Sequence, residues 1–188
     1  QKKCITGAEA LMRWTHAEHG FIPPDKFIPL AEQTGHIQPM TEWVLETALS
    51  QCAEWHRNGL NIGVSVNLSA YSLNGIDLLD SVRHALAKAK LEPKWLTLEL
   101  TETAIMSDPN RALSTLSRLN SMGIVLSIDD FGTGYSSLAY LKRFPVNEIK
   151  IDKSFDMDMT EDASDAVIVR STIELEHNLG MSVIAEGI

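Results

Sequence analysis

Residues 61–69 read NIGVSVNLS, a short β-branched run that ends on polar side chains. Two valines alternate with Ser65 and Asn67, so apolar side chains share one face of an extended chain and polar ones share the other. This pattern predicts a β-strand over Asn61–Leu68 that packs its apolar face on helices and ends on a polar residue.

Five further segments are rich in Val, Ile and Leu, as strands generally are. These predicted strands are Ile5–Leu11, Trp95–Leu100, Ile124–Ile128, Glu148–Asp152 and Ser182–Ala185. Predicted helices lie between the strands, at Asp25–Gln33, Thr41–Asn58, Ile76–Ala89, Pro109–Met122, Ser136–Arg143 and Ala163–Leu179. Strands that alternate with helices pair in parallel through right-handed crossovers, so we expect an α/β fold.

Two α/β architectures fit six strands: an open doubly wound sheet and part of a barrel. A nucleotide-binding sheet carries a glycine-rich turn after its first strand, and this sequence has none there. In a (β/α) barrel the carboxyl ends of all strands converge on one rim, where active sites are built. Because the polar residues of this chain gather at strand ends, the barrel is the favoured interpretation.

Composition favours one soluble globular domain: 188 residues, 44% of them hydrophobic, without a linker or low-complexity tract. No apolar run approaches the roughly 20 residues of a membrane helix, so we expect a cytoplasmic domain without membrane contact. The parent protein could carry a membrane anchor elsewhere. A net charge of −9 argues against DNA or RNA polymers, although bound divalent cations could still attract an anionic ligand. Cys4 and Cys52 are expected to be reduced packing residues, and His16 and His19 surface histidines.

Every predicted strand ends on polar or charged side chains. In chain order these are Glu9, Asn67, Glu99, Asp129 with Asp130, Lys150 with Asp152, and Glu186. In a barrel they would form one cluster, and carboxylates gathered in one place repel one another unless they are protonated or bridged by cations. Each acid alone could be a helix N-cap or a surface residue, and Lys150 a structural ion-pair partner. Capping alone does not readily give polar ends to all six strands.

Oxygen ligands from Glu, Asp and Asn suit hard cations such as Mg²⁺ or Mn²⁺ better than zinc. The adjacent Asp129 and Asp130 form a natural place for two ions to share a ligand. Two metals about 3.5–4 Å apart are the usual clamp for phosphodiester cleavage. Lys150 could then orient or deprotonate the attacking water, because nearby cations lower the pKa of a lysine.

The strand ends lie within short motifs that occur in order along the whole chain. The first is Glu9-Ala10-Leu11, followed by Arg13-Trp14. The others are FIPLAE at 27–32, VNLS at 66–69, ELTE at 99–102, IDDFGTG at 128–134, KID at 150–152 and AEG at 185–187. This series resembles the EAL-domain family, bacterial phosphodiesterases that linearise cyclic di-GMP. A single three-letter match would carry no weight, whereas the ordered series is specific.

The resemblance implies a role for each matching residue. One metal ion would be bound by Glu9, Asn67, Glu99 and Asp129, and Asp129 would bridge to a second ion that Asp130 also contacts. The cofactors would be two Mg²⁺ or Mn²⁺ ions, with Ca²⁺ inhibitory. The water nucleophile would be handled by Lys150 with Asp152 and Glu186, and the substrate would be met by Arg13, at a phosphate, and by Leu11.

The family's mobile loop, which couples substrate and metal binding to dimerisation, corresponds to Phe131, Gly132, Thr133, Gly134 and Tyr135. Glu102 matches the acid that anchors this loop. A homodimer is therefore expected, together with sensory or cyclase domains covalently linked in the parent protein.

The family fold adds a strand before Glu9 and, after Glu186, an eighth strand and a final helix. We therefore expect a single EAL-type phosphodiesterase domain over residues 1–188, incomplete at both termini. Its fold would be a TIM-like (β/α)8 barrel with six of the eight strands in this chain.

The expected function is metal-dependent hydrolysis of cyclic di-GMP to the linear dinucleotide pGpG. One alternative is a non-catalytic receptor that binds cyclic di-GMP and signals through contacts with another protein. Another is an unrelated Mg²⁺-dependent barrel enzyme that acts on a small carboxylate, but this alternative leaves Arg13 and the loop motif unexplained.

Overall fold

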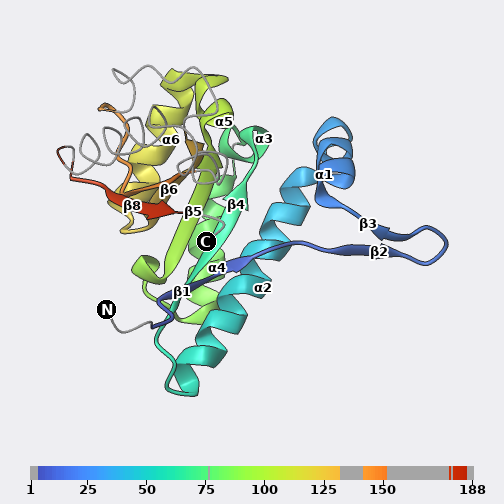
Figure 1. Ribbon diagram of the computed structural model, residues 1–188, viewed down its shortest axis with the longest axis horizontal. Helices are drawn as coiled ribbons and strands as arrows, with labels where there is room; N and C mark the ends of the chain where they lie inside the picture. Colours follow the sequence, from blue (N-terminus) through green and yellow to red (C-terminus); the bar gives the residue numbers. More distant parts are fainter. Residues whose placement is uncertain (1–3, 76, 132–141, 152–177, 179, 186–188) are drawn as a thin grey trace, which may run out of the picture. The chain divides into compact units, whose positions relative to one another are not determined.

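The protein is described by a computed structural model, which covers residues 4–75, 77–131, 142–151, 178 and 180–185. The chain divides into two compact units, Gln1–Leu98 and Glu99–Ile188. Figure 1 labels the helices and strands. Within the described residues no helix is both long and apolar enough to span a membrane.

The first unit contains a parallel strand pair and the helices around it. Strand β1 (Gly7–Ala10) pairs with β4 (Gly63–Leu68) so that Glu9 lies opposite Ser65. Between them come the antiparallel β2 (Trp14–His16) and β3 (Gly20–Ile22), then α1 (Pro24–Gln33) and α2 (Ile37–Arg57). After β4 follow α3 (Ala70–Leu73), α4 (Leu78–Ala89) and a 3₁₀ turn at Pro93–Trp95.

Helix α2 builds the core of this unit because its apolar residues recur at helical spacing. Its buried side chains include Val44, Leu45, Ala48, Leu49 and Cys52, and the helix packs against β4 and α4 (Figure 1). The alternate residues Val64, Val66 and Leu68 of β4 are buried as well. The apolar strand face therefore packs inside the unit, as its alternation predicts.

In the second unit the strands follow one another in chain order, β5, β6, β7 and β8. They are β5 (Leu96–Thr101), within which the division between the units falls, β6 (Val125–Phe131), β7 (Glu148–Ile151) and β8 (Ser182–Ala185). Strands β6, β7 and β8 pair in parallel. The helices α5 (Glu102–Met106) and α6 (Pro109–Ser121) connect β5 to β6. Leu116, Leu119, Leu126 and Ile149 are fully buried here.

All six predicted strands are present, as β1, β4, β5, β6, β7 and β8. Strand β6 runs three residues beyond its predicted end, to Phe131. Helix α2 begins four residues before its predicted start. Pro39 does not prevent this, because it lies in the first turn, where no backbone N–H is needed. The sequence reasoning missed β2, β3, α3 and α5, which are too short to show a period. Nearly all of the predicted helices Ser136–Arg143 and Ala163–Leu179 lie outside the described residues.

The two cysteines differ in their surroundings. Both are free, and Cys52 is buried in α2, as expected. The prediction that Cys4 is a packing residue is wrong, because this residue precedes β1 and is exposed.

Candidate metal and catalytic site

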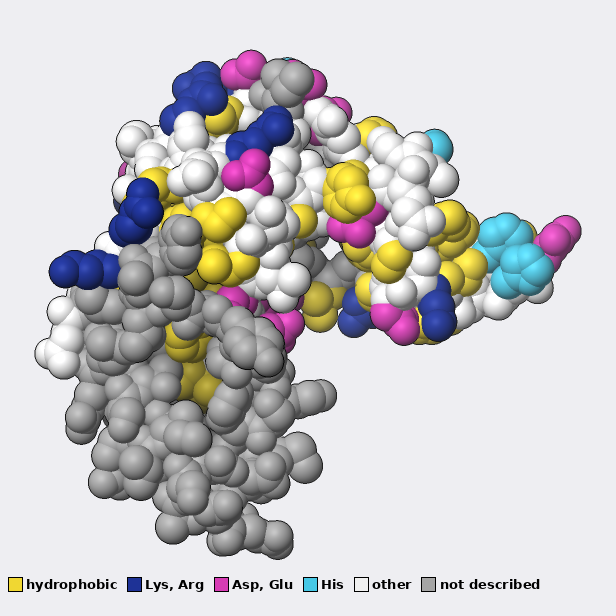
Figure 2. Space-filling view, turned by 90° about the horizontal axis from the view of Figure 1, so that it is seen from above, with side chains coloured by type: hydrophobic (Ala, Val, Ile, Leu, Met, Phe, Trp, Pro, Cys, Tyr) yellow, Lys and Arg dark blue, Asp and Glu magenta, His cyan; other side chains and the backbone are white. Residues whose placement is uncertain are grey.

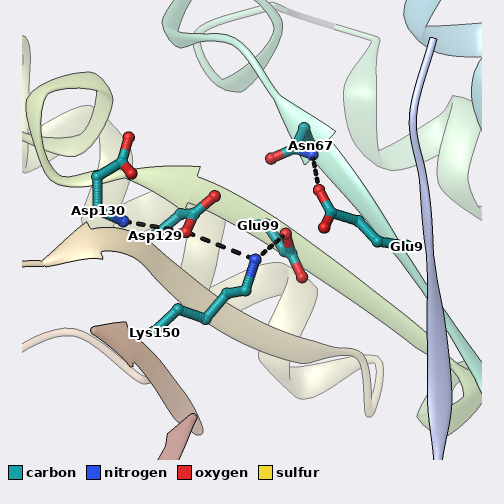
Figure 3. A network of polar contacts seen from close by, with 6 residues as sticks. All are labelled: Glu9, Asn67, Glu99, Asp129, Asp130 and Lys150. Atoms are coloured by element: carbon teal, nitrogen blue, oxygen red, sulfur yellow. Dashed lines mark hydrogen bonds and ion pairs between the residues drawn. The ribbon is translucent and has the colours of Figure 1, made fainter. Parts of the chain in front are cut away.

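In the first unit the structure brings together two of the predicted metal ligands. Asn67 Nδ2 donates a hydrogen bond to Glu9 Oε1 at 2.7 Å (Figure 3). Glu9 lies on β1 and Asn67 on β4, and the parallel pairing of these strands joins residues that are far apart in the sequence. Both side chains are exposed, so their oxygens are accessible to a ligand.

Asn67 and Glu99 are not helix caps. The short helix after β4 is capped by Ser69, whose hydroxyl accepts a hydrogen bond from the Ser72 N–H. The helix after β5 is capped by Thr101, whose hydroxyl accepts from the Ala104 N–H. In both places the cap lies two residues beyond the candidate ligand, and the capping explanation therefore fails for Asn67 and Glu99.

In the second unit three charged side chains from neighbouring strands meet. Lys150 Nζ donates a hydrogen bond to Glu99 Oε2 at 2.9 Å and lies 3.5 Å from Asp129 Oδ1 (Figure 3). The side chains of Lys150, Glu99 and Asp129 are 7%, 3% and 15% exposed. Charges so deeply buried are tolerated only when they are paired. Here the positive charge of Lys150 is paired with the negative charges of Glu99 and Asp129.

The backbone at Asp130 departs from regular strand geometry. Asp130 has a φ of +53°, and the pairing of β6 with β7 shifts register between Ile128 and Phe131. This left-handed conformation is uncommon outside glycine, although Asp tolerates it better than most residues. The Asp130 N–H donates to Asp129 Oδ1 at 3.0 Å, and the Asp130 side chain points away from Lys150 in Figure 3. The irregularity therefore separates the directions of two adjacent carboxylates.

Two more polar side chains, Ser127 of β6 and Glu148 of β7, lie two residues before Asp129 and Lys150 on these strands. Glu148 precedes Lys150 by two residues, which places both on the same face of β7, and the register sets Glu148 opposite the fully buried Ser127. Burial raises the pKa of the half-buried Glu148 carboxyl, and the positive charge of Lys150 partly opposes this shift. The sequence reasoning did not single out either residue.

The carboxylate and amide oxygens of the predicted ligands suit a hard divalent cation, but the described carboxylates do not form one compact group. Among the described residues, no three His, Cys, Asp or Glu side chains lie together as metal ligands would. However, the oxygens of Glu99 and Asp129 already converge on one positive charge, the ammonium group of Lys150. Carboxylate oxygens directed at a cation are the ligands that Mg²⁺ and Mn²⁺ use.

Arg13 and Leu11, predicted to meet the substrate, follow β1 and are both exposed. Arg13 Nη1 donates to the carbonyl of Met12 at 2.8 Å. Both residues line a hollow of about 280 Å³ that also reaches Glu9. Arg13 additionally borders a larger, mainly apolar hollow of about 590 Å³. The residues of this second hollow are Met12, Arg13, Trp14, Phe27, Leu30, Ala31, Thr34, His36, Met40 and Trp43. The sequence reasoning missed this hollow, which the short hairpin and α1 help to build.

His16 and His19 lie side by side on the β2–β3 hairpin. Their rings stack with centroids 4.8 Å apart. Histidine side chains are cyan in Figure 2, where a group of them lies on the molecular surface. His16 Nδ1 accepts hydrogen bonds from the backbone N–H groups of Glu18 and His19. The His16 side chain therefore stabilises the turn that follows β2. The expectation that both histidines lie at the surface agrees with this geometry.

The remaining predicted residues are only partly described. Glu102 is buried at the start of α5, and Phe131 is buried at the end of β6. Gly132, Thr133, Gly134, Tyr135, Asp152 and Glu186 lie outside the described residues. The structure thus brings Glu9 to Asn67 in one unit and Lys150 to Glu99 and Asp129 in the other. That these two groups meet around shared ions stays a prediction.

Comparison with known proteins extends over the whole chain. A family model described as "EAL domain" matches residues 1–188. The bifunctional diguanylate cyclase/cyclic di-GMP phosphodiesterase MucR of Pseudomonas aeruginosa is 47% identical over 185 residues, which are 98% of this chain and 27% of MucR. The cyclic di-GMP phosphodiesterase NbdA of the same species is 44% identical over 181 residues, 96% of this chain and 23% of NbdA. The chain therefore spans about a quarter of the length of these relatives.

A solved structure described as "PaMucR Phosphodiesterase, c-di-GMP complex" is similar to this chain with a TM-score of 0.89 and 47% identity. The match covers 96% of this chain and 73% of that one. It confirms the predicted fold class, an α/β fold of the TIM-like (β/α)8 barrel type, of which six strands are described here.

Proposed function

This chain belongs to the EAL domain family, and on that premise we propose that it hydrolyses cyclic di-GMP to the linear dinucleotide pGpG with divalent metal ions. The names of MucR and NbdA, which include cyclic di-GMP phosphodiesterase activity, support this substrate. The observation that carries the proposal is the buried cluster of Lys150, Glu99 and Asp129. Even with its charges paired, such a cluster adds little net folding free energy, because desolvation offsets the attraction, so we infer that it serves the chemistry.

Two Mg²⁺ or Mn²⁺ ions would be held by carboxylate and amide side chains near the strand ends. We assign Glu9, Asn67, Glu99 and Asp129 to the first ion, and Asp129 with Asp130 to the second. When bound, such ions polarise phosphoryl oxygens and lower the pKa of coordinated water. Because Asp129 and Asp130 point in different directions, the two carboxylates would be able to serve different ions.

Lys150 would orient the attacking water or take up its proton, assisted by Asp152 and Glu186. The water oxygen attacks one phosphorus atom, the bond from that phosphorus to the ribose O3′ breaks, and O3′ takes up a proton. The product is a linear dinucleotide that keeps its 5′-phosphate. In the structure Lys150 lies beside Glu99 and Asp129, two of the proposed metal ligands, which supports a role for it at the same site.

Arg13 would bind a substrate phosphate, because its guanidinium keeps its charge at all physiological pH values. Leu11 would contact the substrate from the neighbouring position, and both residues line the hollow that reaches Glu9. We further propose that residues 131–135 form a mobile loop anchored by Glu102, which couples the site to a homodimer. In the parent protein this domain would lie in the cytoplasm and would be covalently linked to sensory or cyclase domains.

A direct assay tests the function. The complete protein is incubated with cyclic di-GMP and Mg²⁺ or Mn²⁺, and the products are separated by chromatography. We expect pGpG to accumulate, its formation to stop with Ca²⁺, and Glu9→Ala to abolish it because a metal ligand is lost. If micromolar protein yields no linear product, the proposed activity is wrong.

Calorimetry separates the enzyme from a receptor. A non-catalytic receptor would bind cyclic di-GMP equally well after metal removal and would show negligible turnover. The enzyme should bind the dinucleotide in Ca²⁺ and convert it only after Ca²⁺ is replaced by Mg²⁺ or Mn²⁺.

A further inference from the structure

The cluster in the second unit holds one positive charge against two negative ones. Lys150 contributes the ammonium group, and Glu99 and Asp129 contribute the carboxylates. Two buried carboxylates close together repel each other strongly unless a cation lies between them. In this structure Lys150 lies against both carboxylates and provides that positive charge.

The two oxygens that face Lys150 belong to proposed ligands of the first metal ion. Nζ lies 2.9 Å from Glu99 Oε2 and 3.5 Å from Asp129 Oδ1. Mg²⁺ requires ligand oxygens at about 2.0–2.1 Å, so an ion that binds these oxygens from the side facing Nζ would occupy the space that the ammonium group now fills. Two cations so close together, in a buried place with little screening, repel each other.

We propose that Lys150 is the resident cation of the metal-free protein and that the first metal ion must displace it from Glu99 in order to bind. This inference rests on the proposed function, since it takes Glu99 and Asp129 as metal ligands. Lys150 then has two successive partners: the carboxylates before the ion arrives, and the water nucleophile afterwards. The lysine becomes available for chemistry only when the metal is in place.

The apparent affinity for metal is consequently set by a competition. Removing the ammonium group without removing bulk, as in Lys150→Met, should strengthen metal binding and weaken the metal-free fold. A lysine that serves only to position water would give the opposite result, because its loss would leave metal affinity unchanged or lower it. Lys88→Met is the matched control, since Lys88 forms an exposed ion pair with Glu46 at 2.8 Å.

The test measures Mn²⁺ binding by calorimetry and thermal unfolding with and without Mn²⁺, using the complete protein. For Lys150→Met we expect a dissociation constant for Mn²⁺ lower by about tenfold or more, a lower melting temperature without metal, and a larger rise on adding Mn²⁺. Lys88→Met should match the wild type in all three. Unchanged or weaker Mn²⁺ binding by Lys150→Met, beside normal binding by the wild type, overturns the inference and leaves the proposed function intact. Absence of Mn²⁺ binding in both proteins overturns the inference and the proposed metal site together.

A second measurement uses the unmodified protein and does not depend on the folding of a variant. Crystal structures with and without Mn²⁺ give the distance from Lys150 Nζ to Glu99 Oε2 directly. We expect this distance to exceed hydrogen-bonding range when Mn²⁺ is bound to Glu99 and Asp129. A Lys150–Glu99 hydrogen bond that persists beside a bound ion contradicts the displacement.

Discussion

At the scale of single residues, the pair formed by Lys150 and Glu99 is the most demanding feature of the protein. Both side chains are almost fully buried, and a hydrogen bond of 2.9 Å joins their opposite charges. An intact buried pair adds little net stability, because desolvation offsets the attraction, but breaking it by removing one partner is strongly destabilising. The pair is therefore best explained by the chemistry that it serves.

Removing Glu99 should accordingly destabilise the metal-free protein. We expect Glu99→Ala to lower the free energy of unfolding by about 3–5 kcal/mol, because the buried Lys150 loses the carboxylate to which it donates a hydrogen bond. Urea unfolding followed by circular dichroism measures the change. Glu46→Ala, which breaks the exposed pair with Lys88, should unfold almost as the wild type does. Equal effects of the two substitutions would contradict the importance of burial.

At the scale of secondary structure, each strand divides its tasks between its two faces. The apolar side chains of β4 pack on α2, whereas Asn67, on the other face, meets Glu9. The cap of the following helix falls to Ser69, so Asn67 is left for another role. This division explains why a strand end can carry a functional side chain without weakening the helix that follows.

Helix α2 should be the most sensitive element of the first unit. Leu49 is fully buried against its neighbours, and Leu49→Ala should lower the free energy of unfolding by about 2–5 kcal/mol, because it removes apolar contacts and leaves a cavity. Trp43→Ala on the same helix removes a larger side chain that is 62% exposed, and it should cost clearly less. Denaturant midpoints of the two variants, measured together, decide the order, and a reversed order would contradict the packing described for α2.

At the scale of the whole molecule, the proposed function assigns Glu9, Asn67, Glu99 and Asp129 to one metal ion. Asn67 belongs to the first unit and Glu99 to the second. That these residues converge on one ion is a prediction that follows from membership of the EAL domain family. The ligands are separated by 32 residues of sequence, so their meeting depends on the tertiary arrangement.

A double-mutant cycle tests that convergence. Asn67→Ala and Glu99→Ala should each weaken Mn²⁺ binding, and the loss in the double variant should differ from the sum of the two single losses, because both residues contact one ion. Calorimetry with Mn²⁺ gives the four dissociation constants. Strict additivity of the two effects would indicate that Asn67 and Glu99 act at independent places.

Much of the fold could be predicted from local pattern. The alternation in β4 and the runs of Val, Ile and Leu in the other strands correctly indicated six strands, because the period of two is a property of the extended chain itself. The hairpin of β2 and β3 was missed, since three residues are too few to establish a period. The conformation of Asp130 was also missed, because a local register shift depends on the partner strand.

By itself the sequence determined the α/β class, the polar residues near the strand ends and the membership of a family, since all three follow from residue types and their order. Only the tertiary structure decided that Lys150 bonds to Glu99, that Asn67 reaches Glu9, and that Asp130 turns away from Lys150. These contacts join side chains 51 and 58 residues apart, or depend on how one strand registers against the next. Strand pairing and burial create such contacts, and no local pattern in the chain encodes them.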